Sequence, residues 1–174
     1  MHKILVVVDM QKDFIDGALG FEGADTIIPG IISKIKEYER SGDEIVYTLD
    51  THFDNYMDTQ EGRNLPVPHC IKGSDGHKVC DELASLLDGK KCFEKPCFGS
   101  MELAGYLEKN SSEISAVEIC GLVSNICVLS NAVLAKAAVP EAEIIVDSGL
   151  TASFAPDLHQ ATLDVLKGIQ VKVL

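Results

Sequence analysis

The residues best suited to chemistry follow successive apolar runs of the chain. Asp9 follows "KILVVV", Asp50 and His52 follow "EIVYTL", Lys95 follows "KKCF", and the turn 124–127 follows "AVEICGL". A carboxylate, an amine and a thiol brought together can activate a nucleophile for attack on a carbonyl carbon. Any one of these residues alone has an ordinary explanation, since an Asp after a strand is often a cap or turn residue. The recurrence after four runs is what favours a catalytic site.

The two cysteines of "EICGLVSNICV" stand in different settings. Cys120 lies within the apolar run, where burial raises a thiol pKa, and is expected to be structural. Cys127 lies in a small and apolar segment that resembles a buried helix, so a packing role is its simplest explanation. However, Ser124 or Asn125 can cap that helix, which would put Cys127 in the first turn, where the helix dipole favours a thiolate. Lys95, taken alone, is equally consistent with an exposed loop lysine.

A possible metal site lies in "LDTHFDNYMDTQEGRNLPVPHC". Asp50, His52, Glu61 and His69 offer carboxylate and imidazole ligands suited to zinc, manganese or iron, with coordination positions left for water and substrate. A solvated acidic loop is the alternative, because Asp54 and Asp58 lie in the same segment. Spacing alone leaves both possibilities open.

These residues must be positioned by a regular framework. Continuous apolar runs at 3–8, 44–49, 90–93, 116–122, 143–146 and 169–174 are typical of strands buried on both faces. Segments with helical spacing separate them, notably 24–42, with Gly42 as its expected C′ residue, and 155–168, with Gly168 after its end. This alternation predicts an α/β fold, a three-layer α/β/α sandwich with a parallel sheet. The carboxyl ends of its strands, where ligands bind in such sheets, would carry the residues named above.

Composition limits the classes of function. The 174 residues predict a single domain, 1–174, and 46% apolar content suffices for one core. A formal charge of −12 argues against nucleic acid or anionic membrane as a partner and favours a small-molecule substrate. Six cysteines without paired spacing and a start without a secretory pattern predict a cytoplasmic protein with reduced thiols. His77 and His159 are expected to be exposed residues of a loop and a helix.

Five separated motifs resemble those of the isochorismatase-like cysteine hydrolases, and the set is most similar to the nicotinamidase/pyrazinamidase branch. They are "VVVDMQKDF", "TLDTH", "PHCIKGSDG", "FEKPCFGS" and "CGLVSNICV", in matching order along nearly the whole chain. The resemblance implies a Rossmann-like, six-stranded parallel sheet. It also implies hydrolysis of nicotinamide to nicotinate and ammonia through a Cys thioester, a role in NAD salvage, and assembly into a homo-oligomer.

The resemblance also implies roles for individual residues. Its catalytic triad corresponds to Asp9, Lys95 and Cys127, and an aromatic that packs on the substrate ring corresponds to Phe14. A cis peptide is implied at Leu122–Val123, with the backbone N–H groups of Val123 and Cys127 directed at an oxyanion. The implied cofactor is a divalent metal ion, zinc first and manganese or iron otherwise, with the ligands Asp50, His52, Glu61 and His69.

The chain departs from the branch at two points. Ser124-Asn125 stands where Thr-Asp is common, and Pro66, beside Leu65, stands where an aromatic usually precedes the second metal His. Two other hypotheses therefore accompany the nicotinamidase-like one. One is a related cysteine hydrolase for another small amide or carbamoyl compound. The other is a paralogue that binds a ligand without turnover, against which the joint presence of the three triad residues argues.

Overall fold

The predicted parallel sheet of six strands is confirmed. The computed structural model describes residues 1–174, and its strand order is β3-β2-β1-β4-β5-β6, with every neighbouring pair parallel. The strands are β1 (His2–Val8), β2 (Glu44–Asp50), β3 (Lys91–Lys95), β4 (Ile114–Leu122), β5 (Glu143–Ala152) and β6 (Lys172–Val173). The chain reverses its direction of winding between β1 and β4. In open α/β sheets a ligand crevice forms at such a point.

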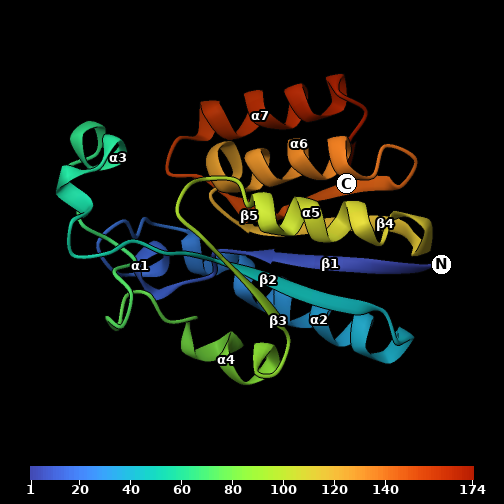
Figure 1. Ribbon diagram of the computed structural model, residues 1–174, viewed down its shortest axis with the longest axis horizontal. Helices are drawn as coiled ribbons and strands as arrows, with labels where there is room; N and C mark the ends of the chain where they lie inside the picture. Colours follow the sequence, from blue (N-terminus) through green and yellow to red (C-terminus); the bar gives the residue numbers. More distant parts are fainter.

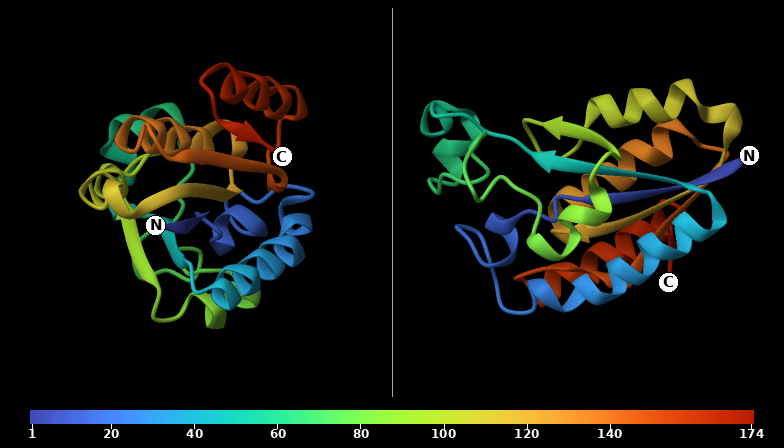
Figure 2. Two further views of the ribbon diagram at one scale, coloured as in Figure 1. Left: turned by 90° about the vertical axis from the view of Figure 1, so that its right-hand side faces the viewer. Right: turned by 90° about the horizontal axis from the view of Figure 1, so that it is seen from below.

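Helices cover both faces of the sheet (Figures 1 and 2). The helices are α1 (Lys12–Ile15), α2 (Ile28–Ser41), α3 (Gln60–Asn64), α4 (Asp81–Leu87), α5 (Met101–Lys109), α6 (Leu129–Ala138) and α7 (Pro156–Gly168). Shorter helical turns are Ala24–Ile27, Tyr56–Asp58, Ser111–Glu113 and the π-helical turn Ser124–Val128. Helices α2 and α4 pack on one face, and α5, α6 and α7 on the other. No helix is both long and apolar enough for a membrane span.

The unbroken apolar runs arise because each central strand is buried on both faces. In β1, Ile4, Val6 and Val8 pack in the cluster with α5 and α6, whereas Leu5 and Val7 pack with α2 and α4. All five side chains are fully buried. Alternate residues of a strand point to opposite faces, so a strand between two helical layers must be apolar at every position.

Several predicted boundaries differ by a few residues. Gly42 ends α2 in the left-handed conformation, with φ of 74°, as its C′ role requires. The prediction for Gly168 was wrong by one residue, because α7 includes it. Strand β3 runs beyond its apolar run to Lys95, and β5 extends well past residue 146. These extensions carry strand geometry into polar residues that hydrophobicity alone does not mark.

The path of the chain into the turn Ser124–Val128 is fixed by a close approach of β4 to β1. Gly121 has φ of 111°, and a side chain there would collide with the backbone of Val8 on the neighbouring strand. Glycine is required at this position by both its conformation and its packing. The peptide bond that follows, Leu122–Val123, is cis. The chain thereby leaves the sheet and enters the turn Ser124–Val128, which continues into α6.

A buried polar group joins β4 to α2. Glu118, 5% exposed, accepts a 2.8 Å hydrogen bond from the Tyr38 hydroxyl and lies 3.0 Å from the Lys34 ammonium. Burial and the bond to Glu118 raise the pKa of the Tyr38 hydroxyl, so it remains a donor at neutral pH. A buried carboxylate without donors is costly, and both of these donors come from one helix face.

We expect Tyr38→Phe to lower the free energy of unfolding by about 2 kcal/mol, because a buried carboxylate oxygen loses its donor. Urea unfolding measures the change. The matched control is Tyr106→Phe, which removes a hydroxyl bonded to Glu44, whose side chain is 29% exposed. Water can replace that donor, so the control should lose less than about 1 kcal/mol. Equal losses in both variants would contradict the role given to the buried pair.

Candidate active site

The carboxyl ends of the strands bring the predicted triad residues together. The Lys95 Nζ lies 2.7 Å from Asp9 Oδ2 and 3.5 Å from the Cys127 Sγ. The three side chains are buried, with exposed fractions of 0% for Asp9, 1% for Lys95 and 5% for Cys127. They come from the ends of β1 and β3 and from the turn after β4. Three residues far apart in sequence thus form one contacting group, and their chemical roles stay a prediction.

The conformation of Asp9 is held by β2. Its backbone has φ of 48°, which turns the chain immediately after β1. The Thr48 hydroxyl donates a 2.6 Å hydrogen bond to Asp9 Oδ1, and the Asp9 N–H is directed at Thr48 in return. Thr48 was not among the predicted site residues. One carboxylate oxygen is thereby occupied by Thr48, while the other faces Lys95.

The pKa shifts describe a thiol with a base beside it. Burial raises the pKa of the Cys127 thiol, the charge of Asp9 raises it further, and the Lys95 ammonium opposes both. Burial also raises the pKa of Asp9, against the attraction of Lys95. Burial would lower the pKa of Lys95, but the negative charges around it raise it well above its ordinary value. The Lys95 side chain therefore stays a charged ammonium.

This result corrects one expectation about Cys127. The residue does lie at the start of a helix, in the turn Ser124–Val128 before α6. The helix dipole was expected to favour a thiolate, but burial and the neighbouring carboxylate outweigh it. The raised pKa keeps Cys127 in its thiol form at neutral pH.

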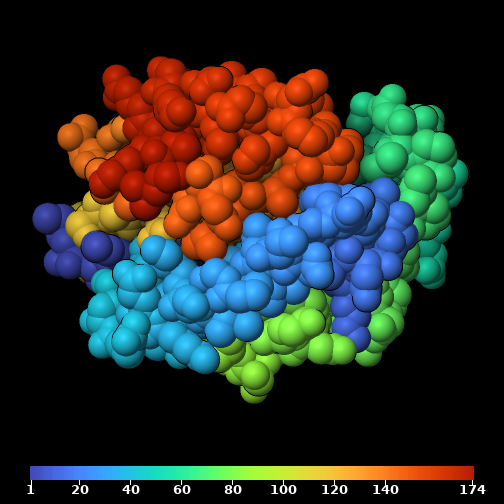
Figure 3. Space-filling model, turned by 180° about the vertical axis from the view of Figure 1, so that it is seen from behind, coloured from blue at the N-terminus to red at the C-terminus, as the bar shows by residue number.

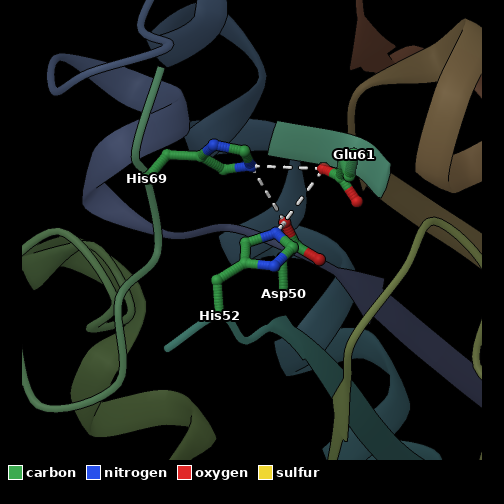
Figure 4. Close-up of side chains that lie close together, drawn as sticks. All are labelled: Asp50, His52, Glu61 and His69. Atoms are coloured by element: carbon green, nitrogen blue, oxygen red, sulfur yellow. Dashed lines mark hydrogen bonds and ion pairs between the residues drawn. The ribbon is translucent and has the colours of Figure 1, made fainter. Parts of the chain in front are cut away.

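The four predicted metal ligands also converge, and their ligand atoms lie within 4.8 Å of one another (Figure 4). Asp50 Oδ2 lies 3.0 Å from His52 Nε2 and 3.3 Å from His69 Nε2. Glu61 Oε1 lies 3.6 Å and 3.8 Å from the same two nitrogens. Ligands at about 2.0–2.2 Å from a tetrahedral ion stand about 3.3–3.6 Å apart, so these separations suit a divalent cation.

The surroundings of the cluster support the same interpretation. His69 Nδ1 lies 2.8 Å from the Val67 carbonyl, which accepts its N–H and leaves Nε2 as the free ligand atom. Burial and the charge of Asp50 raise the pKa of Glu61, a repulsion that a cation would relieve. Although burial opposes it, the nearby His52 and His69 rings and the positive charge of Lys95 keep the pKa of Asp50 low. The donor set therefore fits a divalent metal ion better than it fits a solvated loop.

Asp50 joins the two groups. Its Oδ2 faces the histidines, while its Oδ1 lies 3.2 Å from Lys95 Nζ. Gln11 holds the Asp50 backbone on both sides: its Oε1 accepts from Asp50 N at 2.8 Å, and its Nε2 donates to Asp50 O at 2.9 Å. Gln11 is fully buried and was missed by the sequence analysis, although it lies two residues after Asp9 in "DMQKDF".

Aromatic side chains border the metal cluster. Tyr56, which the sequence analysis did not single out, contacts His52 and His69 edge to face at ring-centre distances of 4.8 and 5.1 Å. The ring of Phe14, in α1, contacts the His69 ring, and the two ring centres lie 5.8 Å apart. Phe14, Val123 and seven other residues line a cavity of about 460 Å³, a volume typical of small-molecule sites.

The residues at the two departures from the family motifs have definite surroundings in the structure. Leu65, beside Pro66, lines the same cavity as Phe14, so an aliphatic side chain stands at that wall. In the Ser-Asn pair, Ser124 Oγ lies 2.9 Å from His159 Nδ1, and Asn125 Oδ1 accepts a 2.7 Å bond from the Ser153 hydroxyl.

The two histidines that were expected to be exposed are both half-buried. His159 contacts Ser124, the first residue of the turn Ser124–Val128. His77 lies 2.9 Å from the Thr51 hydroxyl through its Nε2, beside the metal cluster. Both predictions were wrong, because partners distant in sequence cover these side chains.

The comparison with known proteins agrees with this geometry. The Isochorismatase family model, an isochorismatase domain, matches residues 3–174. The chain belongs to the isochorismatase family. Within that family it is 30% identical to an uncharacterized isochorismatase family protein PncA of Bacillus subtilis, over 76% of this chain and 78% of that one.

Two further proteins match over nearly their whole length. A nicotinamidase of Saccharomyces cerevisiae is 25% identical, with 99% of each chain covered. The crystal structure of the pyrazinamidase of Pyrococcus horikoshii in complex with zinc superposes with a TM-score of 0.86 at 27% identity, covering 100% of this chain and 99% of that one. The matched regions include the sheet and the segments that carry the two groups of side chains, the predicted triad and the four predicted metal ligands.

Replacing Asp9 with Asn should make the Cys127 thiol easier to ionise. The change removes a negative charge that raises the thiol pKa and keeps the Lys95 ammonium, so the midpoint of alkylation against pH should fall by at least about one unit. Iodoacetamide rates at Cys127 from pH 6 to 10, resolved by peptide mass spectrometry, measure the midpoint. Asp16→Asn, at an exposed position, is the control with an unchanged midpoint. A shift to higher pH would show that the charge relation is wrong.

The four candidate metal ligands predict about one divalent ion bound per chain. In calorimetric titrations with Zn²⁺ and Mn²⁺, His69→Ala should weaken binding by at least about tenfold, because a ligand is lost. His77→Ala is the matched control, since it removes a nearby histidine whose Nε2 contacts Thr51 and not the cluster. Binding that is equally strong in wild type and His69→Ala would rule out the assigned ligand set.

Proposed function

We propose that this protein is a metal-containing thiol amidohydrolase of the nicotinamidase type, which converts nicotinamide to nicotinate and ammonia. The observation that carries the proposal is the buried contact of Lys95 with both Asp9 and Cys127. A thiol, a base and a fixed positive charge at one sheet edge are what acyl transfer through a thioester requires. The similarity to the nicotinamidase of Saccharomyces cerevisiae and to the pyrazinamidase of Pyrococcus horikoshii supports the choice of an aromatic amide.

In the first half of the reaction, Asp9 takes the proton of the Cys127 thiol as the sulfur attacks the amide carbonyl carbon. The backbone N–H groups of Val123 and Cys127 are proposed to stabilise the oxygen as it becomes negative. Lys95 keeps the separated charges balanced while the proton resides on Asp9. When the carbon–nitrogen bond breaks, Asp9 returns that proton to the leaving nitrogen, and ammonia departs.

In the second half, Asp9 accepts a proton from water as the water oxygen attacks the thioester carbon. The carbon–sulfur bond breaks, the carboxylic acid product leaves, and Asp9 returns the proton to the Cys127 sulfur. Phe14 is proposed to pack on the ring of the substrate throughout.

The metal site has a separate role in this proposal. Asp50, His52, Glu61 and His69 would hold the ion, for which we propose zinc, with manganese and iron as alternatives. A bound divalent ion would supply a Lewis acid that can hold a ring nitrogen and so orient the substrate. The zinc in the archaeal pyrazinamidase structure supports the choice of metal.

The decisive test is ammonia release from nicotinamide and pyrazinamide. We expect turnover by the wild type and a loss of at least about a thousandfold in kcat for Cys127→Ala, because the nucleophile is removed. Cys120→Ala, in the neighbouring strand, is the control and should retain turnover. Activity that survives in Cys127→Ala would refute the thiol mechanism.

The same assay separates the alternatives. Nicotinamide that is inert beside a small carbamoyl compound that is hydrolysed quickly would select the related cysteine hydrolase. Turnover unaffected by complete removal of the metal would refute only the proposed role of the metal in orienting the ring.

A further inference from the structure

The cavity of about 460 Å³ beside the turn Ser124–Val128 extends beyond the residues that the proposed mechanism uses. Its inner part is lined by Phe14, Val123 and Ile126, the last of which directly precedes Cys127. Its outer part is lined by Leu65 and Phe154, which are 37% and 59% exposed, and by Phe21, whose ring contacts that of Phe154. Eight of its nine lining residues are apolar, and none is charged. Whatever occupies the outer part must therefore be uncharged and apolar.

Phe154 stands at the mouth of this cavity with much of its ring in solvent. It is 59% exposed, and its ring contacts that of Phe21 edge to face at 6.1 Å. A large aromatic side chain left exposed at the rim of a cavity gains free energy when a ligand covers it. Figure 3 shows the blue segment near residue 20 meeting the red-orange segment near residue 150 on one face of the molecule.

The segment that carries Phe154 is attached to the turn Ser124–Val128. The Ser153 hydroxyl donates a hydrogen bond to Asn125 of that turn. The Ser153 Oγ also accepts a hydrogen bond from the N–H of Ala155, so the backbone is fixed on both sides of Phe154. His159, further along α7, contacts Ser124. The Ser-Asn pair therefore fixes the distance between Phe154 and the reactive thiol. An aromatic side chain held in this way can discriminate between substrates of different size.

We propose that Phe154 is a specificity-determining residue, and that the enzyme prefers aromatic amides whose ring carries a small apolar substituent. The inference rests on the proposed function: the amide lies at Cys127, the ring lies against Phe14, and the substituent extends between Phe21 and Phe154. The substituent there removes exposed aromatic surface from water, which an unsubstituted ring is too short to do.

Nicotinamide and its 5-methyl and 6-methyl derivatives test the proposal. For the wild type, kcat/KM for the better methyl derivative should exceed that for nicotinamide by about fourfold, the gain expected from burying one methyl group. In Phe154→Ala this ratio should fall to about one, chiefly through a higher KM for the methyl derivative. The matched control is Val165→Ala, which truncates an apolar side chain of α7 that is 55% exposed and outside the cavity, and this variant should keep the wild-type ratio.

Binding of the corresponding carboxylic acids, measured by calorimetry, separates this proposal from the proposed function. If no amide is hydrolysed but the affinity ratio of methylnicotinate to nicotinate falls in Phe154→Ala, the proposed reaction is wrong and the role of Phe154 stands. If the amides are hydrolysed and the ratio is the same in wild type and Phe154→Ala, the role of Phe154 is overturned. A wild type that never prefers a methylated ring, in turnover or in binding, overturns it as well.

Discussion

The buried ammonium of Lys95 is the interaction on which the rest of the site depends. It lies between Asp9 and Asp50, two carboxylates that burial would otherwise force to become protonated. Removing any one of these charges from the interior would leave another without a partner, which is far more costly than leaving a surface charge unpaired. The ends of β1, β2 and β3 must therefore stay in register to within a hydrogen-bond length. The fold supplies this precision because the three strands are neighbours in a sheet buried on both sides.

The sequence predicted the framework because the physics of a buried parallel sheet leaves a direct mark on it. A strand covered by helices on both faces must be apolar throughout, so the six runs identified six strands. The same geometry explains why polar residues after those runs converge: the carboxyl ends of parallel strands share one edge. Asp9, Lys95 and Cys127 could thus be assigned to one site before any contact was known. Their resemblance to a known family added the roles that spacing alone left open.

Other parts of the site left no such mark. Gln11, Thr48 and Tyr56 act through contacts with residues that are distant in sequence or on another strand, and their types fit many positions equally well. His159 has the spacing of a surface helix residue, and it is covered because α7 packs on the turn Ser124–Val128. The expected thiolate at Cys127 failed for a related reason. The helix dipole is a local effect that sequence reveals, whereas burial and a facing carboxylate depend on the assembled fold.

The close approach at Gly121 limits how this protein can change over generations. No side chain is tolerated where β4 passes β1, and the turn that follows inherits its path from that contact. The thiol consequently follows a strand contact that tolerates no side chain at Gly121. Phe21, Leu65 and Phe154 belong instead to segments outside the regular elements. Substitutions are therefore tolerated more easily at the rim of the cavity than beside the thiol.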